Sequence, residues 1–306
     1  MMRNVLWSFA APVAAMVLFC GCGGEAGGDP AEATDEDASQ LTGNARVVYV
    51  GDSIAYETRS IIQNDLEATG RVGFASSTKG GMAICDFFPE TEAPVGSGTL
   101  RTYPPAAANL SELVAFMKPH VVAMQFWGNS WGFTPCMKDA NGNILQPGTP
   151  AYYDRYRKDA NHAMELIAAA AAKAGAPMPA VLWTLQGPDA GSATRTRELN
   201  AIYASLSQTW PTATTVDAGF TVSMAANYWN PGDRYTWSRF LPCTQLERTT
   251  GHCIDAYGGV ARIHSDQDSL HFCLGTTTSG ACDVWSPGVY RYGLAISTEI
   301  KKALGL

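Results

Sequence analysis

The chain has 306 residues, of which 46% are hydrophobic and 16% charged, and its formal net charge is −7. This length suits one large α/β domain, and the composition is that of an ordinary globular protein. Six acidic residues lie in one stretch without a base, so the rest of the chain is close to neutral and lacks the basic run that binds phosphates. We therefore expect no nucleic acid partner. The six are Glu25, Asp29, Glu32, Asp35, Glu36 and Asp37.

Residues 1–22 have the pattern of an export signal. Arg3 provides a positive start, and the apolar run from Val5 to Phe19 is short for a bilayer span and is followed by small residues. A small residue precedes Cys22, as in bacterial lipoprotein signals, so Cys22 is a candidate for lipidation, with plain secretion as the alternative. Residues 23–45 form an acidic, Gly-rich linker that suits a membrane tether. We expect an exported protein, either lipid-anchored in the cell envelope or secreted.

Strand and helix patterns alternate from residue 46 to residue 306, which we interpret as one catalytic domain. This alternation indicates an α/β fold with a mostly parallel five-stranded sheet covered on both faces. Residues 223–280 lack clear periodicity and are expected to form long loops. The predicted strands are Val47–Val50, Val72–Ala75, Val121–Phe126, Ala180–Leu185 and Ala213–Val216. The predicted helices are Ser53–Ala68, Ala106–Lys118, Tyr152–Ala174, Ala193–Ser207 and Pro287–Ala303, the third with Asp154, Arg155, Arg157, Lys158 and Asp159 on its exposed side.

Six cysteines follow the export signal. An even number in an exported chain favours disulfides, although the sequence does not determine which cysteines pair. We take the pairs to be Cys85–Cys136, Cys243–Cys253 and Cys273–Cys282. The alternative is a metal site, but no CxxC pair at zinc-finger spacing supports it, so we expect no metal. The residues that such a site would use are His252, Cys253, His271 and Cys273.

The segment Gly51-Asp52-Ser53 follows the first predicted strand and opens the first helix. Ligands of open α/β sheets bind outside the carboxyl ends of the strands. A serine at a helix N-terminus also lies beside backbone N–H groups that can hold an oxyanion. Asp and Ser are equally the preferred residues for capping a helix, so the segment alone is weak evidence for catalysis.

Two further segments follow the next strands. Gly80-Gly81 could bring a backbone N–H close to a substrate oxygen, and Gly128-Asn129 could direct a side-chain amide into the same crevice. Both sequences are also common in turns and loops. Each is therefore ambiguous when it is taken alone.

Asp268 precedes His271 by three residues. This spacing lets the carboxylate accept a hydrogen bond from one imidazole nitrogen while the other nitrogen faces a nucleophile. His264 is the rival base, with Asp266 and Asp268 nearby. The remaining histidines are His120, His162 and His252.

These segments occur in the order of the conserved blocks of the SGNH/GDSL hydrolases, which this chain resembles over nearly its whole length after Arg46. The resemblance is strongest to an exported, actinobacterial-type branch of that family, in which the segments seen here at 80–86 and 134–137 recur. The four blocks are Gly51-Asp52-Ser53-Ile54, Gly80-Gly81, Gly128-Asn129 and Asp268-Ser269-Leu270-His271.

The resemblance implies a flavodoxin-like, three-layer α/β/α sandwich and a serine hydrolase. It implies Ser53 as nucleophile, His271 as base and Asp268 as the residue that orients it. It also implies an oxyanion hole formed by the N–H of Ser53, the N–H of Gly80 and the side chain of Asn129, with Gly81 as the alternative to Gly80. The chain departs from the family pattern at Ser130, where the family often has aspartate, and this affects how the loop is held.

The expected activity is hydrolysis of an ester-linked acyl group on a carbohydrate or lipid, with Trp127 and Trp131 lining the substrate pocket through their aromatic faces. One alternative is acyl transfer to a cell-envelope glycan. Another is a glycan- or lipid-binding module without catalysis. No cofactor is expected, because neither a GxxxxGK[ST] nor a GxGxxG segment is present. We expect the protein to be a monomer.

Overall fold

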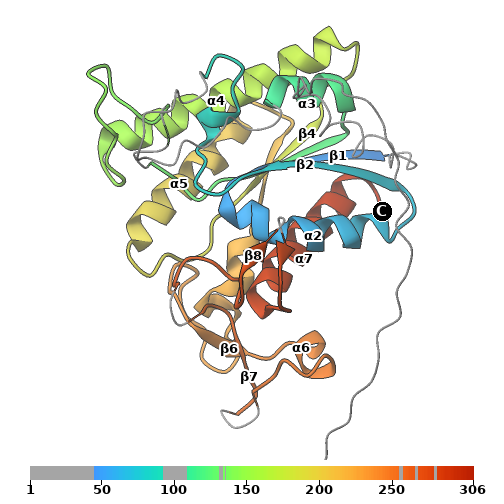
Figure 1. Cartoon of the computed structure of the whole chain (residues 1–306), viewed down its shortest axis with the longest axis vertical. Helices are drawn as coiled ribbons and strands as arrows, with labels where there is room; N and C mark the ends of the chain where they lie inside the picture. Colours follow the sequence, from blue (N-terminus) through green and yellow to red (C-terminus); the bar gives the residue numbers. More distant parts are fainter. Residues whose placement is uncertain are drawn as a thin grey trace, which may run out of the picture.

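The structure is a computed structural model with a five-stranded parallel sheet at its centre (Figure 1). The strand order is β2-β1-β3-β4-β5, and every neighbouring pair is parallel. The strands are β1 (Ala45–Gly51), β2 (Val72–Thr78), β3 (Val121–Gln125), β4 (Ala180–Thr184) and β5 (Ala213–Val216). The structure describes residues 45–91, 109–130, 134, 136–254, 258–265, 268–278 and 281–306. The predicted export signal, Cys22 and almost all of the predicted linker lie outside these residues.

Helices cover both faces of the sheet, as Figure 1 shows. One face packs against α3 (Leu110–Met117), α4 (Pro150–Lys173) and α5 (Ala193–Ser205), and the other against α2 (Ser53–Glu67) and α7 (Pro287–Ala303). Each face therefore has its own apolar core. The three-layer α/β/α sandwich expected from the sequence is confirmed.

The transition from β1 to α2 requires glycine at position 51. A Cβ atom there would lie 2.1 Å from the carbonyl oxygen of Gln125 and 2.6 Å from the Cβ of Ala55. Both distances are far inside van der Waals contact, so no larger side chain fits between the ends of β1 and β3. This close approach brings the residues after the two strands together.

The helices begin at residues that favour helix starts. Asp52 caps α2 through a hydrogen bond from Ile54 N–H at 3.0 Å, and Thr149 caps α4 ahead of Pro150. Pro287 occupies the first turn of α7, where its missing N–H costs no hydrogen bond. The helix expected over 106–118 is described from Leu110, since 106–108 lie outside the described residues.

The region after β5 contains more secondary structure than the sequence predicts. Two short antiparallel sheets form there, β6 with β7 and β8 with β9. Their strands have only two or three residues, which is too short to show an alternation of apolar and polar side chains in the sequence. The elements are η3 (Ala218–Val222), η4 (Met224–Ala226), β6 (Phe240–Pro242), α6 (Gln245–Thr249), β7 (Val260–Arg262), β8 (Thr277–Thr278) and β9 (Ala281–Cys282).

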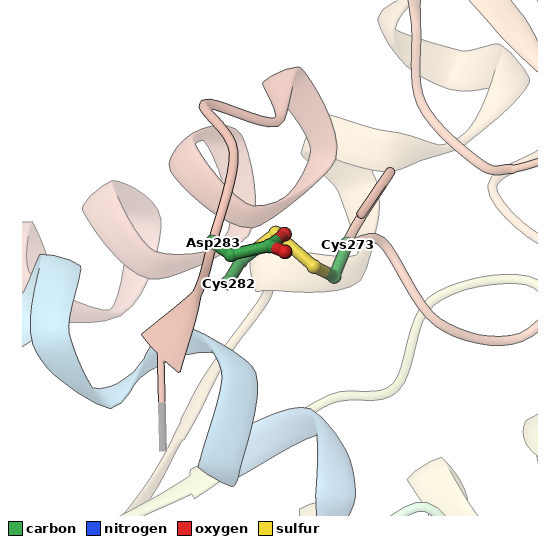
Figure 2. A group of neighbouring side chains, drawn as sticks. All are labelled: Cys273, Cys282 and Asp283. Carbon is green, nitrogen blue, oxygen red and sulfur yellow. A yellow bond between two sulfur atoms is a disulfide. The ribbon is translucent and has the colours of Figure 1, made fainter. Parts of the chain in front are cut away.

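Three disulfides join Cys85 to Cys136, Cys243 to Cys253 and Cys273 to Cys282, which are the pairs expected from the sequence. Figure 2 shows that Asp283 lies beside the third disulfide. Both sulfurs of this group are bonded to each other, so neither is a thiolate that could bind a metal. The alternative metal site fails for the same reason, because its two cysteines belong to different disulfides. Its His252 instead stacks on Trp285, with ring centroids 3.9 Å apart.

Asp159 corrects one expectation about α4. The sequence places it on the exposed side of the helix, but it is only 6% exposed. Both of its carboxylate oxygens lie 2.8 Å from Nε of Arg155, one turn earlier, and share its N–H, which compensates for the burial. Burial nevertheless raises the pKa of Asp159.

Among the described residues, no helix is both long enough and apolar enough to cross a membrane.

Candidate active site

The strand order places a crevice at the carboxyl ends of β1 and β3. In sheets of order 2-1-3-4-5, successive connections leave these two strands on opposite faces, and ligands bind where they diverge. Here β1 continues into α2 on one face, whereas the chain after β3 leads to α4 on the other. Ser53 lies two residues after the end of β1, and Asn129 lies four residues after the end of β3. The topology therefore brings together two segments that are 76 residues apart in the chain.

Ser53 is the first residue of α2 and is partly exposed. The N–H groups in the first turn of a helix have no partner within the helix, so they can bind an anion. Gly80 lies directly beside Ser53, because a Cβ built on Gly80 would be 3.8 Å from the Cβ of Ser53. This proximity supports the preference for Gly80 in the second block, while Gly81 has a φ of 78° and forms the turn.

Asp52 is buried and connects the first and third blocks. Its Oδ2 accepts the Trp127 N–H at 2.5 Å and the side-chain amide of Asn129 at 3.2 Å. That amide also donates to the carbonyl of Met82 at 2.9 Å, so Asn129 connects its own loop to the two other loops of the crevice. An oxyanion role for Asn129 requires that a substrate oxygen share one of these hydrogens.

Tyrosines of α4 and α5 hold the loop that follows β3 and contains Gly128-Asn129. Three buried hydroxyls donate to three carbonyls of one short loop, which holds the backbone on either side of Gly128. None of the three was expected from the sequence, although the spacing of four residues between two tyrosines on α4 indicates a shared helix face. The bonds run from Tyr203 to Phe126 at 2.9 Å, from Tyr152 to Gly128 at 2.7 Å and from Tyr156 to Asn129 at 2.7 Å.

Ser130 holds the next part of this loop. Its hydroxyl donates to the carbonyl of Leu145 at 2.5 Å, and the residue is 3% exposed. Ser130 therefore anchors this loop to the segment that precedes α4.

Gly128→Ala is expected to destabilise the protein by about 3 kcal/mol or more. Gly128 has a φ of 101°, and an added Cβ would lie 2.4 Å from both the Leu199 Cδ1 and the Tyr152 hydroxyl, so backbone strain and overpacking add together. Gly142→Ala is the control, because its φ of 82° carries the strain but no atom lies within 4 Å. Urea unfolding of the oxidised proteins should show a much smaller loss for the control. Equal losses of unfolding free energy in the two variants would mean that the close contacts around Gly128 do not contribute to the effect.

His271 and Asp268 form the pair expected from the sequence. The Nδ1 of His271 lies 2.6 Å from Oδ2 of Asp268. The other oxygen of Asp268 accepts the N–H of Leu270 at 2.8 Å and that of His271 at 3.1 Å, so the carboxylate shapes the loop as well as orienting the ring. The hydrogen bond to His271 holds the pKa of Asp268 far below its usual range. Because Nδ1 is engaged, Nε2 is the nitrogen available for proton transfer.

The surrounding charges strongly favour the protonated form of His271. Burial alone lowers the pKa of His271, but the hydrogen bond to Asp268 and the negative charges of Glu57, Asp268 and Asp52 outweigh it and raise the pKa to about 9. Asp52 directly precedes Ser53, so His271 lies within the electrostatic neighbourhood of the helix start.

The raised pKa of His271 predicts how the rate of ester hydrolysis depends on pH. A base must be neutral to accept a proton, so kcat/KM for an ester is expected to rise with pH through about 9 and then level off. The measurement is p-nitrophenyl acetate turnover from pH 6 to 10, corrected for spontaneous hydrolysis. A limb near the ordinary histidine value of about 6.5 would show that these carboxylates do not act on the base.

Glu57 is a buried residue of the site that the sequence analysis missed. It is 0% exposed, and its oxygens accept the backbone N–H groups of Phe272 and Cys273, each at 3.0 Å. A signal was present, because Glu57 lies three residues after Ile54 and four before Ile61 on the apolar face of α2. A charge at such a position is expected only where the fold provides it with partners.

His264, the rival base, has a different place. It is 0% exposed, and its Nδ1 lies 3.1 Å from the carbonyl oxygen of His271, to which it donates. Burial lowers the pKa of His264 to about 4, and the ring stacks on Trp237. His264 therefore supports the backbone of His271 and is not positioned as a base; Asp266 lies outside the described residues.

The expected pocket residues are only partly described. Trp127 is 3% exposed and packs in the core on the α2 and α7 side, so it is a core residue and does not line an open pocket. This corrects the expectation, and the reason is that apolar side chains of the core pack around Trp127 while its backbone N–H binds Asp52. Trp131 lies outside the described residues.

Two cavities of the described residues lie away from this crevice. One of about 540 Å³ runs along α4, and one of about 360 Å³ lies between η3, α6 and α7. Neither is lined by Ser53, Gly80, Asn129 or His271.

No protein-family model and no curated protein matches the chain. Among solved structures, a GDSL-like lipase from Bacteroides thetaiotaomicron VPI-5482 aligns over 90% of this chain and 98% of its own, with 13% identity and a TM-score of 0.44. A carbohydrate esterase family 2 enzyme with a carbohydrate binding domain, from Corynascus thermopiles (Myceliophthora fergusii), aligns over 86% and 67%, with 14% identity and a TM-score of 0.42. The psychrotrophic esterase EstA from Pseudoalteromonas sp. aligns over 56% and 76%, with 12% identity and a TM-score of 0.34. Because all three TM-scores are below 0.5, the chemistry of this chain has to be judged from its own site.

Proposed function

We propose that the protein is a serine ester hydrolase of the SGNH/GDSL type, with Ser53 as nucleophile, His271 as base and Asp268 as its orienting residue. One observation carries the proposal. The imidazole of His271 is held by Asp268 at 2.6 Å in a loop that is hydrogen-bonded to the helix beginning at Ser53. A serine at a helix N-terminus, with an oriented histidine in a loop bound to the same helix, is an arrangement suited to acyl transfer.

The chemistry follows from these positions. His271 in its neutral form removes the proton from Ser53 Oγ as the oxygen attacks the ester carbonyl. The N–H groups of Ser53 and Gly80, with the amide of Asn129, stabilise the oxyanion, each contributing on the order of 3 kcal/mol in the transition state. His271 then protonates the departing alcohol, and water attacks the acyl-enzyme with His271 again as base.

The substrate we propose is an ester of a carbohydrate or a lipid outside the cytoplasm. Three disulfides support an oxidising location, which agrees with an export signal at 1–22 and with secretion or lipid attachment at Cys22. Transfer of the acyl group to a glycan hydroxyl uses the same acyl-enzyme, so the ratio of released acid to transferred acyl group separates the two reactions.

The test is covalent labelling of the purified, oxidised protein with a fluorophosphonate probe. The wild-type protein should label at Ser53, identified by peptide mass spectrometry, and His271→Ala should label far more slowly. A folded wild-type protein that does not label would support the alternative of a glycan- or lipid-binding module without catalysis.

A further inference from the structure

The carboxylate of Glu57 is buried at a position where an aliphatic side chain would pack well. It lies one helical turn after Ser53, on the same apolar face as Ile54 and Ile61, and is 0% exposed. Burying a carboxylate costs several kcal/mol unless hydrogen bonds or opposite charge compensate for it. The compensating groups therefore indicate what this residue does.

Those groups are two consecutive backbone N–H groups. Phe272 donates to Oε1 and Cys273 to Oε2, each at 3.0 Å, and both directly follow His271. Hydrogen bonds to an ionised acceptor are roughly twice as strong as neutral ones. One side chain thus joins the helix of the proposed nucleophile to the loop of the proposed base.

The other described hydrogen bonds of residues 268–271 do not come from α2. Asp268, which holds the N–H and ring of His271, belongs to the loop itself. His264, which holds the His271 carbonyl, lies just before the loop. Glu57 differs because it comes from α2, so its bonds set the position of His271 relative to Ser53.

We infer that Glu57 is a positioning residue, whose carboxylate fixes the His271 loop to the helix of Ser53 and places a further negative charge near the imidazole. The inference rests on the proposed function for its catalytic meaning. The geometry of the loop and the charge near the ring can both be measured without turnover.

Electrostatics support this role. The charge of Glu57 acts on His271 together with those of Asp268 and Asp52, and all three raise the pKa of the imidazole. Burial raises the pKa of Glu57 to about 7, while the charge of His271 and the two N–H groups lower it and the charge of Asp268 raises it further. When His271 takes the proton from Ser53, an ionised Glu57 stabilises the imidazolium. Loss of this charge should make His271 easier to deprotonate and weaker as a base.

The experiment compares Glu57→Gln with Asp65→Asn in the full protein. Asp65 is a matched control because it also lies on α2 and binds another element, accepting from Ser297 at 2.5 Å and from Lys301 at 2.7 Å on α7. For Glu57→Gln we expect three changes. The kcat for p-nitrophenyl acetate should fall about 10- to 100-fold with little change in KM, the Phe272 and Cys273 amides should exchange faster, and the NMR pKa of His271 should fall. Asp65→Asn should show none of these.

The inference would be overturned if Glu57→Gln kept the wild-type exchange rates of the Phe272 and Cys273 amides and the wild-type pKa of His271. This holds whatever the activity of the variant. Normal kcat in a variant whose His271 pKa has fallen would also count against it. If Glu57→Gln does not fold, Glu57→Asp retains the charge with a shorter reach and should keep the His271 pKa high while the two amides lose protection. Fast exchange of those amides in the wild-type protein would by itself reject the anchoring role.

Failure of the proposed function would give a different result. Ser53→Ala would then retain turnover, while the amide exchange and the His271 titration would still change in Glu57→Gln as expected.

Discussion

Replacing Ser53 with alanine is expected to lower kcat for p-nitrophenyl acetate by about 10⁴- to 10⁶-fold without loss of stability. The acyl-enzyme cannot form without the Ser53 hydroxyl, and what remains is the weak catalysis by binding and by oxyanion donors. The hydroxyl makes no described hydrogen bond that holds the fold, since Asp52 provides the cap of α2. Turnover and thermal unfolding of the same preparation measure the two effects.

Ser60→Ala is the control for this experiment. Ser60 lies on the same helix and is also partly exposed, but it is two turns away from the helix start. It should keep wild-type turnover and fluorophosphonate labelling. Wild-type activity in a pure Ser53→Ala protein would reject Ser53 as nucleophile and leave the His271–Asp268 pair without an assigned partner.

Asp268→Asn is expected to lower kcat by about 10³- to 10⁴-fold. The amide cannot stabilise the imidazolium, and it can favour the wrong tautomer of His271 by donating to Nδ1. Asp268 also accepts from Leu270 and His271 N–H, so part of the loss comes from loosening of the loop. The rate profile separates these effects, because removal of the charge should move the acid limb to lower pH.

Asp283→Asn serves as the matched control. Asp283 accepts from the backbone and hydroxyl of Thr276 in the neighbouring loop, and its pKa is likewise lowered by those hydrogen bonds. It makes no described contact with His271, so kcat should change less than about twofold. A comparable loss in both variants would indicate that any disturbance of these loops inactivates the protein.

The sequence predicts the central fold well, because the signal for each main element is local. Val47–Val50 is a fully buried strand with apolar residues in succession, as expected for a parallel sheet covered on both faces. Pro287 marks the start of the last helix, and the order of strands and helices determines the parallel arrangement. The pair Asp268 and His271 could also be predicted, since both residues lie in one short segment.

The supporting residues could not be predicted because their partners are distant in the chain. Nothing near Glu57 indicates that its oxygens bind Phe272 and Cys273, and a single buried charge has many potential partners. Tyr203 likewise reaches the carbonyl of Phe126 only because the sheet and α5 pack in one particular way. The expectation that Trp127 lines the substrate pocket was wrong for the same reason, because exposure depends on what packs over a residue and not on its type.

The hydrogen bond between Glu57 and Phe272 spans 215 positions. Contacts over such a separation form late in folding, because the closure of so long a loop must be compensated by structure that is already present. The strands β1, β2 and β3 come from the first part of the chain, whereas the proposed base is joined to the helix of the proposed nucleophile only when the C-terminal segment docks against α2. In the proposed mechanism, a chain that lacks this docked segment would contain Ser53 without His271 near it and would be inactive.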